Sequence, residues 1–234
     1  MDQVVVRMLL SINRAFYSQF ASDFSATRLN PQPGYELLAD KLPVNCRSLL
    51  DAGCGNGRLG RFLIEKFDDL HYTGLDSSDE LLAIAQANVN GTFIRRDLAE
   101  DGCLDGLGTF DVVCCLATLQ HIPGVDNRGR LVRDLSEHLN PDAALILSAW
   151  QFPDSARQMR KVVDWSTVGL AKSDVEKSDY LMTWGGNETA LRYVAYIDRR
   201  EIAEHAAAAD LQVKDQFRSD GREGDLNLYA ILRR

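Results

Sequence analysis

The sequence predicts an α/β fold in which helices cover both faces of a doubly wound, mainly parallel sheet of seven strands. Three observations support this prediction. Between residues 48 and 150, short apolar runs alternate with segments of helical periodicity. These runs are continuously apolar, which is typical of parallel strands that are buried on both faces. Only a short polar segment, 219–225, separates the last two predicted strands, so we expect them to form an antiparallel hairpin.

The elements are expected in a regular order along the chain. Residues 1–45 are interpreted as an N-terminal helical cover, in which Phe16, Tyr17 and Phe20 keep helical spacing. The predicted strands cover residues 48–51, 71–76, 92–96, 111–116, 143–150, 211–218 and 226–232. The predicted helices cover residues 58–67, 79–89, 128–139 and 198–209, and Asn140-Pro141 stops the third of them. Right-handed crossovers then place the loops after the parallel strands at one edge of the sheet, where ligands bind.

The segment 151–191 interrupts this alternation. It carries Trp165, Trp184, the pair Gly185-Gly186 and a mixed run of charges, with only patchy helical periodicity. We interpret it as a lid insertion over the edge of the sheet. The chain is therefore expected to be a single domain over residues 1–234.

Composition and charge narrow the classes of function. Lys and Arg number 26 and Asp and Glu number 34, which gives a net charge of −8. This balance disfavours a protein that coats nucleic acid or an anionic membrane, although a local basic patch for RNA is compatible with it. No apolar run approaches the ~20 residues that span a bilayer, and the N-terminus lacks the cleavage site of a signal peptide. We therefore expect a cytoplasmic protein.

The five cysteines predict neither a disulfide framework nor a metal site. Their number is odd, no two form a C-x-x-C pair, and Cys114 and Cys115 are expected to point to opposite faces of a strand. The four histidines also lack the spacing of zinc ligands. Reduced thiols and no bound metal are expected.

The clearest motif is a glycine-rich turn between a predicted strand and a predicted helix, Asp51-Ala-Gly-Cys-Gly-Asn-Gly57. Gly53 and Gly55 lack a Cβ atom, so the backbone can turn sharply and approach a ligand closely. A dinucleotide-binding loop has its third glycine at the position that Arg58 occupies here. An NAD-dependent oxidoreductase is therefore disfavoured. The alternative to a ligand-binding loop is a tight turn that connects strand and helix without binding a ligand.

Acidic residues end the next two predicted strands. Asp76 ends the second strand, where its carboxylate can accept two hydrogen bonds from a ribose diol. Asp97 ends the third strand, where its carboxylate can accept a hydrogen bond from an adenine amino group. Each aspartate alone can serve as a helix cap. Together with Asp51 and the glycine loop, they indicate a nucleoside site.

These motifs and Asp111-Val-Val-Cys-Cys-Leu116 resemble those of class I S-adenosylmethionine-dependent methyltransferases, from residue 48 to residue 150 and on through the terminal hairpin. The resemblance implies that S-adenosylmethionine is the cofactor and that the glycine loop lies against its methionine part. It implies that Asp76 holds the ribose and that Asp97 and Leu98 hold the adenine. Arg28 would close over the carboxylate of the cofactor or bind an anionic group of the substrate. The implied cofactor residues are Arg28, Asp51, Gly53, Gly55, Asn56, Gly57, Asp76, Ser77, Asp97, Leu98 and Leu116.

A narrower resemblance begins at Phe24-Ser-Ala-Thr-Arg-Leu-Asn-Pro-Gln-Pro33, which is similar to the F-S-x-T-R-x-x-P-W-P stretch of the tRNA wobble-uridine carboxymethyl methyltransferases. Gln120-His121 stands where that family has His-His, and Arg192-Tyr193 where it has R-Y-Y-H. The chain departs from the family at Gln32, at Gln120 and at Val194-Ala195. The resemblance implies that tRNA is a partner, that a carboxymethyl group on its wobble uridine is methylated, and that Arg192 and Tyr193 contact the substrate.

The predicted reaction depends mainly on positioning. A carboxylate acceptor needs no base because it is ionised at pH 7, whereas a hydroxyl or an amine benefits from one. His121 follows the fourth predicted strand at the ligand edge and is the candidate base, with a packing histidine as the alternative. Two other functions stay open: O- or N-methylation of a small metabolite, and a cofactor-binding partner subunit without turnover.

Overall fold

The chain folds around the predicted seven-stranded sheet in a computed structural model that describes residues 1–234. The strand order is β3-β2-β1-β4-β5-β10-β9. Neighbours among the first five are parallel, and β10 is antiparallel to both β5 and β9. The fold class and the terminal hairpin are therefore confirmed. The strands are β1 (Ser48–Ala52), β2 (His71–Asp76), β3 (Thr92–Arg95), β4 (Phe110–Leu116), β5 (Leu139–Trp150), β9 (Gln212–Ser219) and β10 (Asn227–Arg233).

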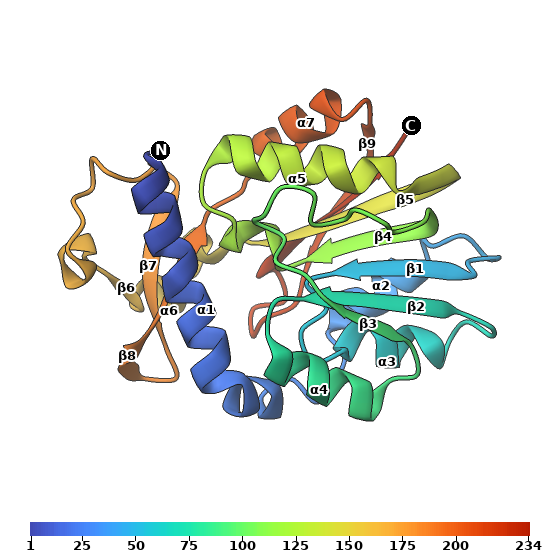
Figure 1. Ribbon diagram of the computed structural model, residues 1–234, viewed down its shortest axis with the longest axis horizontal. Helices are drawn as coiled ribbons and strands as arrows, with labels where there is room; N and C mark the ends of the chain where they lie inside the picture. The colour runs from blue at the N-terminus through green and yellow to red at the C-terminus, as the bar shows by residue number, and fades with distance from the viewer.

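Helices cover both faces of the sheet, with α5 and α7 on one face and α2, α3 and α4 on the other (Figure 1). They are α2 (Pro33–Ala39), α3 (Arg58–Ile64), α4 (Asp79–Asn88), α5 (Val125–Glu137) and α7 (Arg199–Ala208). Successive strand residues supply the two apolar cores in turn, because side chains alternate across a strand. Leu49 belongs to the core under α2 and α3, and Leu50 to the core under α5 and α7. Cys114 and Cys115 separate in the same way, as predicted.

A long helix and a second sheet lie beyond the carboxyl edge of the main sheet. Figure 1 shows α1 (Gln3–Ala26) running past the ends of the parallel strands, between them and the smaller sheet. The smaller sheet is antiparallel in the order β6-β7-β8. Its strands are β6 (Val162–Val163), β7 (Asp179–Trp184) and β8 (Asn187–Ala195), and the short helices nearby are η1 (Leu119–His121), η2 (Phe152–Asp154), α6 (Ala156–Met159) and η3 (Trp165–Val168). α1 contacts both β8 and α4.

The second sheet corrects the reading of segment 151–191 as a stretch with patchy helical periodicity. β7 and β8 form a hairpin through Gly185 and Gly186, whose φ values of 66° and 76° meet the positive-φ requirement of a type I′ turn. A Gly-Gly pair between two runs rich in aromatic and aliphatic residues is a hairpin signal. The charged residues around this pair interrupt the apolar pattern, so the hairpin was not predicted from the sequence.

The ends of several elements also differ from prediction. The helix expected over 128–139 runs from Val125 to Glu137, and Leu139 is the first residue of β5, where it pairs with Phe110. Pro141 therefore lies inside a strand, next to the irregularity where the β4–β5 register shifts. A proline is tolerated there because its missing N–H falls where the ladder is interrupted.

None of the helices combines the length and the apolar composition that crossing a membrane requires.

Candidate active site

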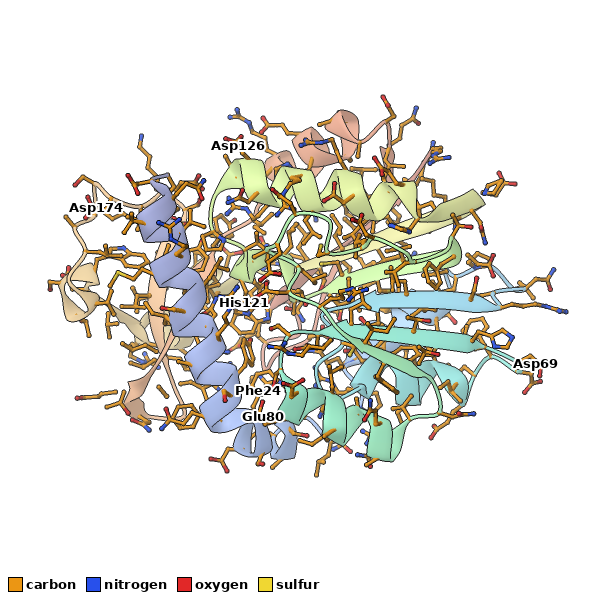
Figure 2. The ribbon with its side chains drawn as sticks, viewed as in Figure 1. Phe24, Asp69, Glu80, His121, Asp126 and Asp174 are labelled. Atoms are coloured by element: carbon orange, nitrogen blue, oxygen red, sulfur yellow. The ribbon has the colours of Figure 1, made fainter.

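A cavity of about 310 Å³ lies at the carboxyl edge of the main sheet, within the size range of small-ligand sites. Its walls come from α1, the β1–α3 loop, the ends of β2, β4 and β5, η1 and β8. Figure 2 shows His121 beside α1 and Phe24 near the carboxyl end of this helix, where it passes the strand ends. Most of the predicted site residues line the cavity: Arg28, Asp51, Gly53, Gly55, Asn56, Asp76, Ser77, Asp97, Leu98, Leu116, His121 and Arg192.

The glycine loop lines the cavity with main-chain atoms that no side chain covers. Gly53 has a φ of +84°, and a Cβ atom there would come within 2.2 Å of the Thr118 Oγ1 atom, so no other residue fits. Gly55 has a φ of +55°, and a Cβ atom there would meet nothing within 4 Å. The backbone of Gly55 is therefore open to a ligand.

Gly57, which the sequence placed among the cofactor residues, does not line the cavity. It caps the start of α3 with a φ of +76°, and a Cβ atom there would press on Val89 and Ala85 at the end of α4. The reason for a glycine at this position is the packing of the loop against a neighbouring helix. Sequence spacing alone could not separate this role from contact with a ligand.

Asp76 is held at the end of β2 by two backbone groups. Its Oδ2 atom accepts from the Gly55 N–H at 2.9 Å, and its Oδ1 atom accepts from the Ser78 N–H at 3.0 Å. A carboxylate has about four acceptor positions, so roughly two remain for hydroxyl donors in the cavity. Burial raises the pKa of Asp76, and the backbone N–H groups act in the opposite direction.

Asp97 lines the cavity but already has partners. Its Oδ1 atom accepts from the Ala99 N–H at 3.0 Å, and its Oδ2 atom pairs with the Arg14 guanidinium at 2.6 Å. Arg14 comes from α1, so this ion pair ties the covering helix to the end of β3. Leu98, beside Asp97, is buried against the cavity wall.

Asp51 is the most buried of the three aspartates. The Tyr72 hydroxyl donates to its Oδ2 atom at 2.7 Å. Burial raises the pKa of Asp51 to about 7, although the Tyr72 hydrogen bond lowers it. The side chain is therefore partly protonated near neutral pH, which fits a structural carboxyl group beneath the glycine loop.

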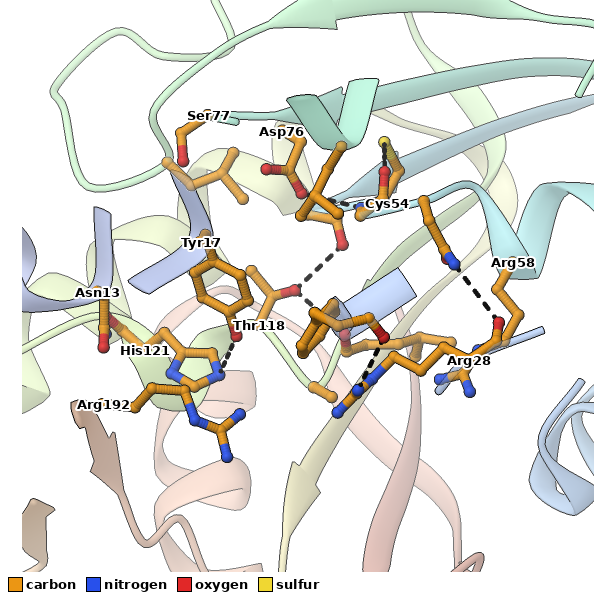
Figure 3. A pocket seen from close by; sticks show the side chains of 18 of the residues that line it. Asn13, Tyr17, Arg28, Cys54, Arg58, Asp76, Ser77, Thr118, His121 and Arg192 are labelled. Atoms are coloured by element: carbon orange, nitrogen blue, oxygen red, sulfur yellow. Dashed lines mark hydrogen bonds between the residues drawn. The ribbon is translucent and has the colours of Figure 1, made fainter. Parts of the chain in front are cut away.

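His121 is neutral and fixed in one tautomer. Its Nδ1 atom lies 3.0 Å from the Tyr193 carbonyl oxygen, which can only accept, so Nδ1 carries the proton. Its Nε2 atom lies 3.1 Å from the Tyr17 hydroxyl and accepts from it. Burial, followed by the positive charges of Arg192 and Arg28, lowers the pKa of His121 to about 3. Figure 3 shows the His121–Tyr17 hydrogen bond at the cavity wall.

Tyr193, which the sequence assigned to the substrate, does not line the cavity. Its side chain is fully buried, and its hydroxyl donates to the Asp179 Oδ1 atom at 2.7 Å. Adjacent residues of a strand point to opposite faces, so Arg192 enters the cavity and Tyr193 turns away. The structure thus places the Tyr193 side chain outside the cavity, an orientation that could not be foreseen because β8 itself was not predicted.

Arg192 reaches the cavity between two aromatic rings. Its guanidinium carbon lies 4.8 Å from the Phe16 ring centroid and 5.0 Å from the Trp150 ring centroid. Its side chain forms no ion pair, and burial lowers its pKa.

Several residues of the cavity were not predicted as site residues. Asn13, Tyr17 and Phe24 share one side of α1, at spacings of four and seven residues, and this helical spacing is a signal that sequence can give. Thr118 lies just after β4, and Trp150 is the last residue of β5. No three His, Cys, Asp or Glu side chains gather into a group that could hold a metal ion.

Comparison with known proteins places this geometry in a family. A family model described as a methyltransferase domain matches residues 11–216. A protein of Encephalitozoon cuniculi that is named as a methyltransferase is 28% identical over 217 residues, which are 93% of this chain and 92% of that protein. The trans-aconitate 2-methyltransferase of Acidovorax sp. (strain JS42) is 33% identical over 147 residues, which are 62% of this chain and 50% of that enzyme.

Solved structures share the fold at lower identity. The DhpI-SAM-HEP complex superposes with a TM-score of 0.68 at 18% identity, covering 97% of this chain and 98% of that one. SAM-bound CalS10, an amino pentose methyltransferase from Micromonospora echinaspora, superposes with a TM-score of 0.59 at 21% identity, covering 86% of this chain and 90% of that one.

Proposed function

The chain belongs to the methyltransferase domain family, and we propose that it transfers a methyl group from S-adenosylmethionine to a small molecule bound in the same cavity. One observation carries the proposal. The glycine loop and Asp76 share a continuous cavity with Tyr17, His121 and Arg192, so a nucleoside and an acceptor can meet there.

The residues present fit a nucleoside cofactor. The open backbone at Gly55 accepts a close ligand, and Asp76 keeps about two acceptor positions for a ribose diol after its two backbone contacts. Asn56 donates from its Nδ2 atom to the Ser25 Oγ atom at 2.9 Å, which holds the end of α1 against the glycine loop. S-adenosylmethionine supplies an activated methyl group that needs only an aligned nucleophile.

The chain's own contribution to the reaction is mainly positioning. α1 covers the strand ends with Tyr17 and Phe24, which limits the access of water to the cavity. Correct alignment of two reactants can supply ~7–11 kcal/mol of the barrier. His121 accepts a hydrogen bond from Tyr17, so we assign it the role of holding this side chain in place. With its pKa lowered to about 3 it is a weak proton acceptor, which makes this positioning role the stronger assignment than that of the candidate base.

The names of the relatives favour a small acceptor. Trans-aconitate and an amino pentose are small molecules, and the net charge of −8 opposes the binding of RNA. Methylation of a carboxymethyl group on tRNA wobble uridine is the second candidate. It is favoured by the placement of Ser25 and Arg28, from the segment that resembles the tRNA enzymes, beside the glycine loop.

Transfer of a labelled methyl group tests both candidates. The protein is incubated with S-adenosylmethionine that is labelled in the methyl group and with trans-aconitate, a small-molecule extract or total tRNA. We expect label in the small-molecule fractions and none with Asp76→Ala. Label in tRNA alone would support the second candidate, and binding of the cofactor without transfer to any acceptor would contradict both.

A further inference from the structure

Arg192 is a buried arginine without an acidic partner. Its exposed fraction is 3%, and its Nε and Nη1 atoms are buried without any hydrogen-bond partner. The contrast with Arg128 is direct. Arg128 is fully buried, but it pairs with Glu201 at 2.6 Å and with Glu176 at 3.3 Å. A buried cation is normally paired because removing it from water is costly.

The neighbours of Arg192 hold it in place without neutralising it. Phe16 and Trp150 flank the guanidinium, and cation–π contacts offset only part of the cost of burial. Two titratable side chains face it: Tyr17, whose hydroxyl donates to His121, and His121, which is neutral in its present hydrogen bonds. The missing partner must therefore come from the cavity.

None of the aspartates of the cavity forms an ion pair with Arg192. Asp97 pairs with Arg14, Asp51 accepts from the Tyr72 hydroxyl, and Asp76 accepts from two backbone N–H groups. Figure 3 shows Arg192 beside His121 and across the pocket from Asp76. The positive end of the cavity is thus separate from the end that fits the ribose.

We propose that Arg192 binds a carboxylate of the acceptor, which makes acidic small molecules the substrate class of this enzyme. The proposal rests on the proposed function, since it names the acceptor of that same site. A planar guanidinium held between two flat rings matches a planar carboxylate, which can accept two parallel N–H groups. Unpaired N–H groups on a buried charge are the donors that such a ligand satisfies.

The cofactor is a second possible source of the carboxylate, and Arg28 is better placed for it. The Arg28 carbonyl oxygen accepts from Asn56 of the glycine loop at 3.4 Å, so Arg28 stands at the loop where the methionine part is expected. Hydrogen bonds from its Nη1 atom to the Phe24 carbonyl oxygen at 3.2 Å and the Thr27 hydroxyl at 2.8 Å hold its side chain at this position. Arg192 lies at the other end, beside His121 and Trp150.

The test compares phenylacetate with phenylacetamide, which have nearly the same shape but differ in charge. Binding to the protein saturated with S-adenosylhomocysteine is measured by calorimetry and by the shift in melting temperature. We expect the wild type to prefer the acid, and Arg192→Met to bind it at least tenfold more weakly, as loss of a charged hydrogen bond implies. Arg160→Met, which removes the same charge from an exposed position outside the cavity, is the matched control and should keep the preference.

Two further measurements separate this proposal from other roles of Arg192. S-adenosylhomocysteine should bind Arg192→Met with wild-type affinity, and a tenfold loss would assign Arg192 to the cofactor carboxylate instead. The ligand-free Arg192→Met protein should melt at the wild-type temperature or above, because an unpaired buried charge is replaced by an apolar chain. A markedly lower melting temperature would indicate a structural arginine.

The proposal is overturned if acid and amide bind the wild type equally, including not at all, or if the preference survives in Arg192→Met. The proposed function has a different point of failure. It fails if the wild type binds no S-adenosylhomocysteine, whatever the behaviour of Arg192.

Discussion

Replacing Asp76 by alanine should abolish most of the cofactor affinity. In the structure, two of its roughly four acceptor positions are taken by the N–H groups of Gly55 and Ser78, which leaves about two for the ribose diol. A hydrogen bond to a charged group contributes ~1.5–3 kcal/mol. Loss of two such bonds amounts to roughly 3–6 kcal/mol, so we expect binding of S-adenosylhomocysteine to weaken at least 100-fold.

Calorimetric titration with S-adenosylhomocysteine measures this loss directly. The titration is run well below the melting temperature of the variant, because the two released N–H groups also cost stability. Asp79→Ala is the matched control, since Asp79 begins α4 three residues away with its side chain 72% exposed and does not line the cavity. An affinity of Asp76→Ala within threefold of the wild type would refute the assignment of the ribose to this carboxylate.

Three other predictions follow from the same structure. Gly53→Ala should lower the free energy of unfolding in urea far more than Gly55→Ala, because only the Cβ atom at position 53 clashes with a neighbour. Gly55→Ala should instead weaken cofactor binding. Equal losses of stability in the two variants would contradict this interpretation. Asp51 has a pKa raised from 3.8 to about 7, so its contribution to stability is complete below about pH 4 and is lost as the pH rises to about 7. Asp51→Asn should therefore gain stability relative to the wild type from pH 5 to pH 8, and a constant difference over that range would be inconsistent with a buried neutral carboxyl group. Arg128→Met should lower the free energy of unfolding by about 3–5 kcal/mol, because Glu201 is left without its cation; a change below about 1 kcal/mol would show that the pair is not needed.

The sheet and the part of the cavity around the glycine loop could be predicted because their signals are local. Gly53, Gly55 and Asp76 stand directly after predicted strands, and parallel strands bring such positions to one edge. The alternation of side chains along a strand is also a local property, so the separation of Cys114 from Cys115 between two cores was correctly predicted.

The part of the cavity around Tyr17, His121 and Arg192 depends on contacts between distant parts of the chain. Tyr17 and His121 are 104 residues apart in sequence and Arg14 and Asp97 are 83 apart, and no local pattern indicates either pair. The orientation of Arg192 follows from the register of β8, a strand that the mixed charges of its surroundings concealed. The sequence suggested Arg192 as a substrate residue only through a resemblance, and it did not reveal that its charge is unpaired.

A crystal structure with S-adenosylhomocysteine tests the central claim most directly. The account predicts that both ribose hydroxyl groups lie within hydrogen-bond distance of the Asp76 carboxylate, with the backbone of Gly55 against the ligand and Arg192 free of it. A nucleoside bound elsewhere, or a ribose turned away from Asp76, would contradict the account.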